Sequence, residues 1–105
     1  MPDHAPPFTI GVEEEYLLVD VDTRAVANDP PAGLFSALHD RTDGRAFPEF
    51  LRSQVEVATP VCRTISEVRT SLTELRRAVV EEAARFGLAP IASASHPFSL
   101  SSKQQ

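Results

Sequence analysis

Three consecutive carboxylates interrupt an apolar run near the N-terminus of this chain. The run from Phe8 to Val19 otherwise alternates like a β-strand, in which successive side chains point to opposite faces. This alternation puts Glu14 on the apolar face and Glu13 and Glu15 on the other, roughly 7 Å apart along the strand. A cation between Glu13 and Glu15 would offset their repulsion. The alternative is a solvent-exposed acidic face, which is common in antiparallel sheets.

A second alternating stretch, from Leu51 to Thr59, also carries a carboxylate in its centre. Its apolar face holds Val55 and Val57, and its other face holds Arg52, Gln54 and Glu56. If the two strands are neighbours, Glu56 joins Glu13 and Glu15 on one sheet face. Carboxylate and amide oxygens are the ligands that hard divalent cations prefer.

Three blocks of this sequence together resemble the N-terminal part of the type 2 glutamate–cysteine ligase family, which comprises ATP-dependent carboxylate–amine ligases. The blocks are Gly11–Tyr16, Ser53–Cys62 and His96–Phe98. Their order and spacing match the family, although each block alone is a weak signal. The resemblance runs from Phe8 to Phe98 and covers only the front part of the family's domain.

The resemblance implies a partial glutamine synthetase-like fold, in which an antiparallel sheet carries the active site on one face and helices on the other. It also implies that ATP and Mg²⁺ activate the side-chain carboxylate of glutamate as an acyl phosphate, which the amine of cysteine or of another acceptor then attacks. By the match of motifs, Glu13, Glu15 and Glu56 take the metal-ligand positions, and no residue is assigned a catalytic role. The candidate contacts to substrate or nucleotide are Arg52, Gln54, Thr59 and His96.

The pattern predicts an α+β chain with one long helix. Thr64 and Glu67 form a capping box, and an apolar stripe at three- and four-residue steps follows. We expect Gly87 to end this helix at the C′ position. The predicted elements are strands Phe8–Val19, Phe47–Thr59 and Leu88–Ser95 and helices Pro31–Asp40 and Ile65–Phe86.

Glu14 and His96 each have two possible roles that the sequence does not distinguish. Glu14 is either a partly buried residue paired with a basic group or the mark of a β-bulge. A bulge would shift the register and so change which carboxylates share one face of the sheet. His96 either contacts the site or only caps a strand. The turn Asp20–Arg24 commonly carries a glycine in the family, whereas Arg24 and Ala25 occupy that place here. The single cysteine, Cys62, is expected to be a small buried apolar residue.

Composition restricts the partners and the location. The 105 residues carry a formal net charge of −5 and no basic cluster, which argues against nucleic acid and anionic membranes as partners. A single cysteine fits a reducing compartment, and neither a signal peptide nor a transmembrane run is evident. We therefore expect a cytoplasmic protein. The chain is expected to divide into a mobile lead at 1–7, the segment at 8–98 that the resemblance implies to be the N-terminal part of a ligase catalytic domain, and a polar tail at 99–105.

Two function classes follow from these features. The first is a segment of an ATP-dependent ligase of the glutamate–cysteine type, and the second is a non-catalytic remnant or a metal-binding or interaction module. The low-complexity stretch Ser99–Gln105 resembles a premature end or a frame change. We therefore expect the isolated chain to be inactive. Its sheet edges would lead either to homo-oligomers or to complementation by a C-terminal segment.

Overall fold

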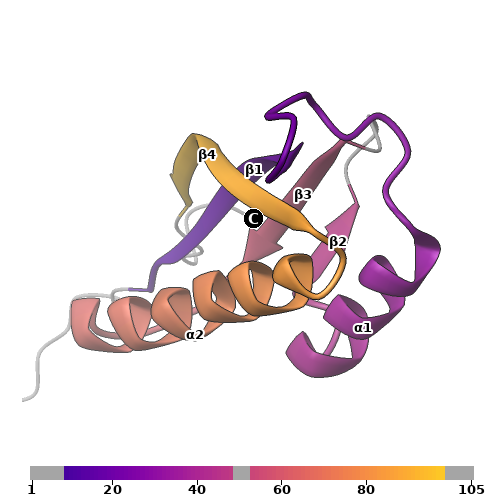
Figure 1. The fold of residues 1–105 in the computed structure, drawn as a ribbon. Coiled ribbons are helices and arrows are strands. Elements are labelled where there is room, and N and C mark those ends of the chain that lie inside the picture. The colour runs from indigo at the N-terminus through magenta and orange to yellow at the C-terminus, as the bar shows by residue number, and fades with distance from the viewer. Residues whose placement is uncertain (1–8, 49–52, 99–105) are drawn as a thin grey trace, which may run out of the picture.

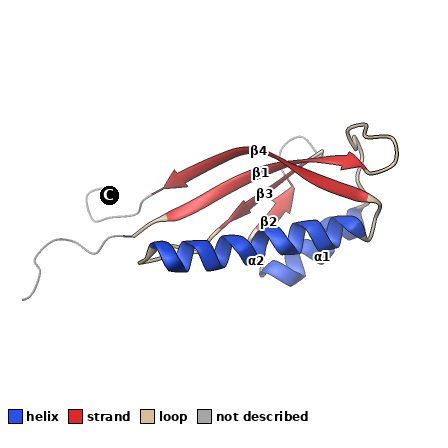
Figure 2. Ribbon diagram, turned by 60° about the vertical axis from the view of Figure 1, so that its left-hand side comes forward, coloured by secondary structure: helices blue, strands red, loops and turns tan. Residues whose placement is uncertain are grey.

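The fold is a two-layer α+β arrangement, as predicted. The computed structural model describes residues 9–48 and 53–98. A four-stranded antiparallel sheet with the order β2-β3-β1-β4 forms one layer (Figure 1), and Figure 2 shows both helices on one side of it. The elements are β1 (Gly11–Asp20), α1 (Ala32–Thr42), β2 (Ala46–Pro48), β3 (Gln54–Ala58), α2 (Ile65–Ala84) and β4 (Leu88–Phe98).

The core lies between the sheet and the helices, where the alternation places it. Leu18, Val55 and Val57 are each 0% exposed, and they belong to one buried cluster with Leu75 and Val79 of the α2 stripe. The predicted burial of this sheet face against the helix is therefore confirmed. The burial is incomplete at one end of β1, where Ile10 and Val12 are only half-buried. Cys62 is buried, as predicted.

The single strand predicted over Phe47–Thr59 is wrong. The chain forms two strands there, β2 and β3, which pair antiparallel with Ala46 opposite Val57 and Pro48 opposite Val55. A proline has no N–H to donate to a ladder, so it belongs at the end or edge of a sheet. Pro48 ends β2 at the sheet edge. The predicted contact residue Arg52 lies outside the described residues.

The long helix begins as its capping box predicts. The Thr64 hydroxyl accepts a hydrogen bond from the Glu67 amide at 3.0 Å. The Glu67 carboxylate accepts from the Arg63 amide at 2.7 Å, one residue before the N-cap. The helix ends at Ala84, two residues earlier than predicted, and Gly87 adopts a left-handed φ of 74° beyond it. Within the described part of the chain, no helix is long and apolar enough to cross a membrane.

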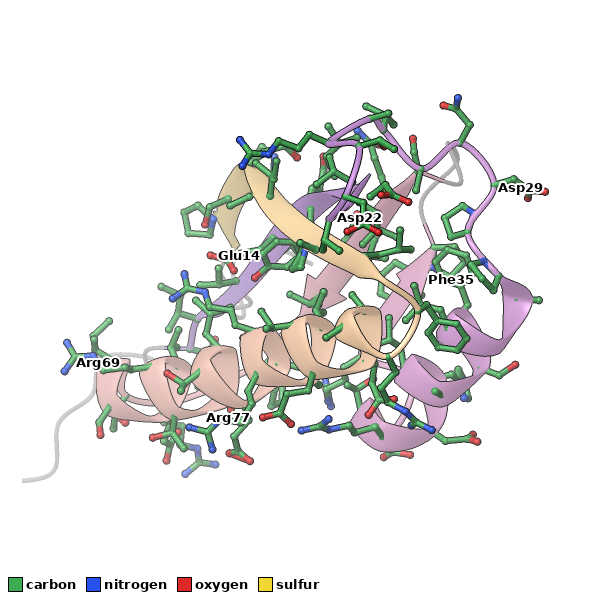
Figure 3. The ribbon with its side chains drawn as sticks, viewed as in Figure 1. Glu14, Asp22, Asp29, Phe35, Arg69 and Arg77 are labelled. Carbon is green, nitrogen blue, oxygen red and sulfur yellow. The ribbon has the colours of Figure 1, made fainter. Side chains whose placement is uncertain are left out.

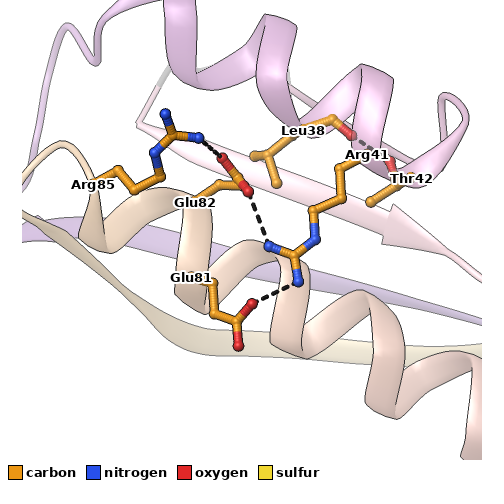
Figure 4. Close-up of polar contacts among 6 residues, drawn as sticks. All are labelled: Leu38, Arg41, Thr42, Glu81, Glu82 and Arg85. Carbon is orange, nitrogen blue, oxygen red and sulfur yellow. Dashed lines mark hydrogen bonds and ion pairs between the residues drawn. The ribbon is translucent and has the colours of Figure 1, made fainter.

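Helix α1 is held against α2 by a cluster of ionic groups. Arg41 donates to Glu82 at 2.9 Å and to Glu81 at 2.6 Å, and Arg85 donates to Glu82 at 3.0 Å (Figure 4). The Thr42 hydroxyl donates to the Leu38 carbonyl and accepts from the Ala46 amide, which ties the end of α1 to the start of β2. These contacts orient α1 beside α2 under the β2 edge of the sheet.

The turn after β1 forms with Arg24 and Ala25 at the place where the family resemblance leads us to expect a glycine. The Asp20 carboxylate accepts hydrogen bonds from the Asp22 and Thr23 amides at 2.8 and 2.9 Å. Arg24 then adopts a left-handed φ of 63°, a conformation that costs any residue with a Cβ atom. The chain returns only as far as a single bridge between Val19 and Val26.

Candidate functional site

The sheet register brings the predicted metal-ligand positions together on the face opposite the helices. Residues directly opposite each other in an antiparallel pair share a face. Glu15 lies opposite Glu56, and Glu13 lies opposite Ala58, the next position on that face. All three glutamates are half-buried, and Figure 2 shows no helix on this side of the sheet. We call this side the open face.

The ladder hydrogen bonds show how closely Glu15 and Glu56 approach. Leu18 donates to the Ser53 carbonyl at 2.8 Å and Thr59 donates to the Val12 carbonyl at 2.9 Å. Hydrogen-bonded and non-hydrogen-bonded pairs alternate along an antiparallel ladder, so the pair that contains Glu15 is non-hydrogen-bonded. In such pairs the Cα atoms are only about 4.5 Å apart and the side chains are closest. Glu15 and Glu56 are therefore the carboxylates best placed to share a ligand.

The neighbouring strands extend the open face with polar and aromatic side chains. His96 of β4 lies opposite Glu13, and Gln54 of β3 lies opposite Leu17. Phe47 of β2 lies opposite Glu56. Two of the predicted substrate contacts, Gln54 and His96, thus share the face with the glutamates, but their roles as contacts stay predictions.

Thr59, a third predicted contact, has a structural role in this chain. Its side chain accepts a hydrogen bond from the Val12 amide at 2.9 Å, and its own amide donates to the Val12 carbonyl. The residue is 2% exposed, which leaves almost none of it accessible to a ligand here. Thr59 fastens the end of β3 to β1, and its contact with a substrate stays a prediction.

The donor set of the open face fits Mg²⁺ better than it fits a metal held by the protein alone. Among residues 9–48 and 53–98, no group of three or more His, Cys, Asp or Glu side chains is arranged to hold an ion. Magnesium usually binds one or two carboxylates and completes its coordination with water and substrate phosphates. Closely spaced carboxylates such as Glu15 and Glu56, on an otherwise accessible sheet face, suit that mode of binding.

Glu14, the middle member of the run, lies on the helix side of β1 with a basic partner (Figure 3). Its carboxylate accepts a hydrogen bond from Arg76 Nε at 2.9 Å and a second from Arg76 Nη2. The Tyr16 hydroxyl also donates to it. These bonds, led by the one from Arg76, lower the pKa of Glu14 against the opposing effect of burial. Burial and the nearby carboxylate raise the pKa of Tyr16.

The sheet also contains a bulge, but it lies in β4 and leaves the alternation of β1 intact. Glu15 pairs with Ala94 and Tyr16 pairs with Ala92, so Ser93 is the extra residue. Its hydroxyl donates to the Glu15 carbonyl at 3.1 Å. Of the two interpretations of Glu14, pairing with a basic group is confirmed. The bulge still bears on the site, because bulges occur next to active sites and redirect neighbouring side chains.

Two charged residues of α2 have roles that the sequence reasoning missed. Neither residue is apolar, so the stripe pattern predicts no buried contact for either, yet Arg76 forms the fork to Glu14 and Glu82 is 8% exposed. A signal existed for Glu82, because it lies three and four residues after the buried Val79 and Ala78, within the stripe. Nothing local marks Arg76 as the partner of a residue on β1.

Comparison with known proteins agrees with these motifs. The sequence profile described as glutamate–cysteine ligase family 2 matches residues 9–105. A Rhodospirillum rubrum protein, named provisionally as glutamate–cysteine ligase 2, is 53% identical over 97 residues, in an alignment that covers 89% of this chain and 25% of that protein. A Jannaschia protein with the same provisional name is 52% identical over 91 residues, 87% of this chain and 24% of its own length. This chain thus spans about a quarter of these relatives, and it belongs to glutamate–cysteine ligase family 2.

Proposed function

We propose that this chain is part of an ATP-dependent carboxylate–amine ligase and that the open face of its sheet is one wall of the active site. In the proposed reaction, a side-chain carboxylate oxygen of glutamate attacks the γ-phosphorus of ATP and ADP leaves. The amine of cysteine, or of another acceptor, then attacks the acyl carbon and phosphate leaves. We further propose that the sheet is a portion of a glutamine synthetase-like fold.

The observation that carries this proposal is the opposition of Glu15 and Glu56 on an accessible sheet face in a member of this family. In the proposal, Glu15 and Glu56 would share a Mg²⁺ ion, and Glu13 keeps the metal-ligand position that the family resemblance gives it. The ion would neutralise charge on the phosphate oxygens during transfer. The strands hold their Cα positions rigidly, which limits the reorganisation that phosphoryl transfer would otherwise need.

Two further side chains would contact the substrates. Gln54 can both donate and accept hydrogen bonds, and His96 can donate to phosphate or carboxylate oxygens. Both lie on strands that flank β1, at positions that share the open face with the glutamates. We propose that they orient the substrates beside the metal without forming bonds to the reacting atoms.

A chimaera tests this function in a complete protein. Residues 9–98 of this chain replace the matching quarter of the Rhodospirillum rubrum relative, and ADP release that requires glutamate and cysteine is measured, with the dipeptide identified by mass spectrometry. We expect an active chimaera, whose turnover at limiting Mg²⁺ falls by about 100-fold with Glu56→Gln, because one charged metal ligand is lost.

The matched control is Glu74→Gln, an exposed glutamate on α2, on the other side of the sheet. It should leave turnover and its Mg²⁺ dependence unchanged. An inactive chimaera beside an active parent relative would count against the ligase function. An active chimaera in which Glu56→Gln keeps the parental Mg²⁺ dependence would refute the metal-ligand role. Tight Mg²⁺ binding without turnover would favour the alternative of a metal-binding module.

A further inference from the structure

The glutamate run lacks the alternation that normally fixes the register of a strand. Positions 13, 14 and 15 carry the same side chain, and the following residues Tyr16–Val19 are continuously apolar. A slip of one residue would exchange the two faces of the strand. It would bury Glu13 and Glu15 and expose Glu14. In this half of β1 the side-chain pattern therefore does not decide which glutamates reach the open face.

The folded chain buries the middle glutamate of the run. Glu14 is 4% exposed, whereas Glu13 and Glu15 are half-buried. Burying a carboxylate is costly unless an opposite charge and further hydrogen bonds compensate for the lost water. Arg76 supplies the charge and a two-bond fork, and Tyr16 supplies a third hydrogen bond. Among the described residues, no buried side-chain nitrogen or oxygen lacks a partner.

We propose that Arg76 is a positioning residue that selects Glu14 as the buried member of the run and so keeps Glu13 and Glu15 on the open face beside Glu56. It acts through Glu14 and touches no substrate. The consequence for metal binding rests on the proposed function, whereas the consequence for strand register does not. Buried polar pairs are known to specify register in other folds at some cost in stability.

The geometry of the fork makes arginine specific for this role. The guanidinium group presents two N–H donors in a plane that matches both oxygens of one carboxylate. Arg76 reaches from α2 to Glu14 on β1, while the side chain of the next residue, Arg77, points away from the sheet (Figure 3). This neighbour has the same side chain and helix environment but no ion pair with a described residue, so it is a matched control.

The test measures register and metal affinity separately on the 105-residue chain. Register is read by NMR from the short Hα–Hα contact that a non-hydrogen-bonded pair gives, here between Glu15 and Glu56. Affinity is read by titration with Mn²⁺ as the probe. We expect Arg76→Met to weaken the Hα–Hα contact and to lower Mn²⁺ affinity at least tenfold, the usual effect of losing a residue that supports metal ligands. Arg77→Met should change neither measurement.

A rescue variant separates positioning from a general contribution to stability. In Glu14→Leu/Arg76→Met, a leucine at position 14 restores a clear alternation with Val12 and Tyr16, so the register no longer needs the ion pair. We expect the Glu15–Glu56 contact and the Mn²⁺ affinity to return. If Arg76→Met folds with an unchanged contact and an affinity within twofold of the parent, the proposal is overturned.

Two further outcomes are decisive. If Arg76→Met does not fold, the same measurements are made on Arg76→Lys, which keeps the charge but not the two-bond fork. An unchanged Glu15–Glu56 contact and an unchanged Mn²⁺ affinity in Arg76→Lys would overturn the proposal. If the parent shows the Glu15–Glu56 contact but binds no Mn²⁺, the metal site of the proposed function fails. The change of register in Arg76→Met still decides the role of Arg76 in that case.

Discussion

Glu15 of β1 and Glu56 of β3 face each other at a non-hydrogen-bonded position of the sheet, opposite the helical layer. Like charges directly opposite each other in a sheet are destabilising. A Mg²⁺ ion bound between the two carboxylates, as proposed above, would offset that repulsion. The proposed site therefore makes a prediction that needs no enzyme assay.

Glu15→Gln should stabilise the chain without divalent cations and remove its stabilisation by Mg²⁺. Neutralising one member of the opposed pair relieves a repulsion of about 0.5 kcal/mol, and it also removes one metal ligand. Urea unfolding with and without MgCl₂ measures both effects. The control, Glu74→Gln on the exposed face of α2, should respond to MgCl₂ as the parent does. Equal stabilisation of Glu15→Gln and the parent by MgCl₂ would contradict the shared site.

Arg24→Gly should raise the free energy of unfolding by about 1 kcal/mol. Arg24 has a left-handed φ of 63°, which glycine adopts without the penalty that a Cβ atom brings. The neighbouring substitution Ala25→Gly is the control, because position 25 does not have a positive φ and glycine there only adds unfolded-state entropy. Urea unfolding should show opposite changes in midpoint for the two variants. A loss of stability in Arg24→Gly would mean that the arginine side chain has a stabilising contact.

The alternation around Glu56 was sufficient to predict which side of the sheet the residues of β3 occupy. Val55 and Val57 are buried and Glu56 shares a face with Glu15, as the two-residue period requires. The same pattern could not reveal the break between β2 and β3. Strand-forming residues continue on both sides of the break, and Pro48 alone marks it. Pairing between strands, which reverses the chain there, is a tertiary property.

The sequence was sufficient to predict which polar residues form the candidate site. It was not sufficient to predict which residues hold those side chains in place. A buried carboxylate in a strand requires a cation, so a basic partner for Glu14 could be expected. Its identity could not, because Arg76 lies 62 positions away in the sequence and several arginines of α2 would serve equally well. Thr59 could be assigned to the site by its motif. Its bond to the Val12 amide depends on the register of β1 and β3.

Thr59→Val should destabilise the fold by about 1–3 kcal/mol, the cost of leaving a buried amide without an acceptor. The valine has nearly the same shape as threonine but cannot accept the hydrogen bond from the Val12 amide. Thr59→Ser keeps the hydroxyl and should lose less. Chemical unfolding of the three proteins gives the comparison. If Thr59→Val unfolds at the parental midpoint, the hydroxyl is not a structural group, and its assignment as a substrate contact would gain support.

The contribution of the ionic cluster between the helices should depend on pH. Hydrogen bonds from Arg41 and then Arg85 lower the pKa of Glu82 against the opposing effect of burial. The folded state therefore binds the proton of Glu82 less readily than the unfolded state does. The stability that results is fully present above the unfolded pKa of a glutamate, about 4.3, and is lost as the pH falls through the lower folded value.

Arg41→Met should consequently lower the free energy of unfolding near neutral pH but have little effect in acid. We expect a deficit of about 1 kcal/mol at neutral pH, because Arg41 is partly exposed and solvent screens its charge. Urea unfolding of the parent and the variant at a series of pH values measures this deficit. It should shrink as the pH falls below about 4.3. Arg77→Met, which removes an exposed charge from α2, the helix that carries Glu82, should show no such trend. A deficit that stays constant across the series would assign the effect of Arg41 to packing of its alkyl chain rather than to its charge.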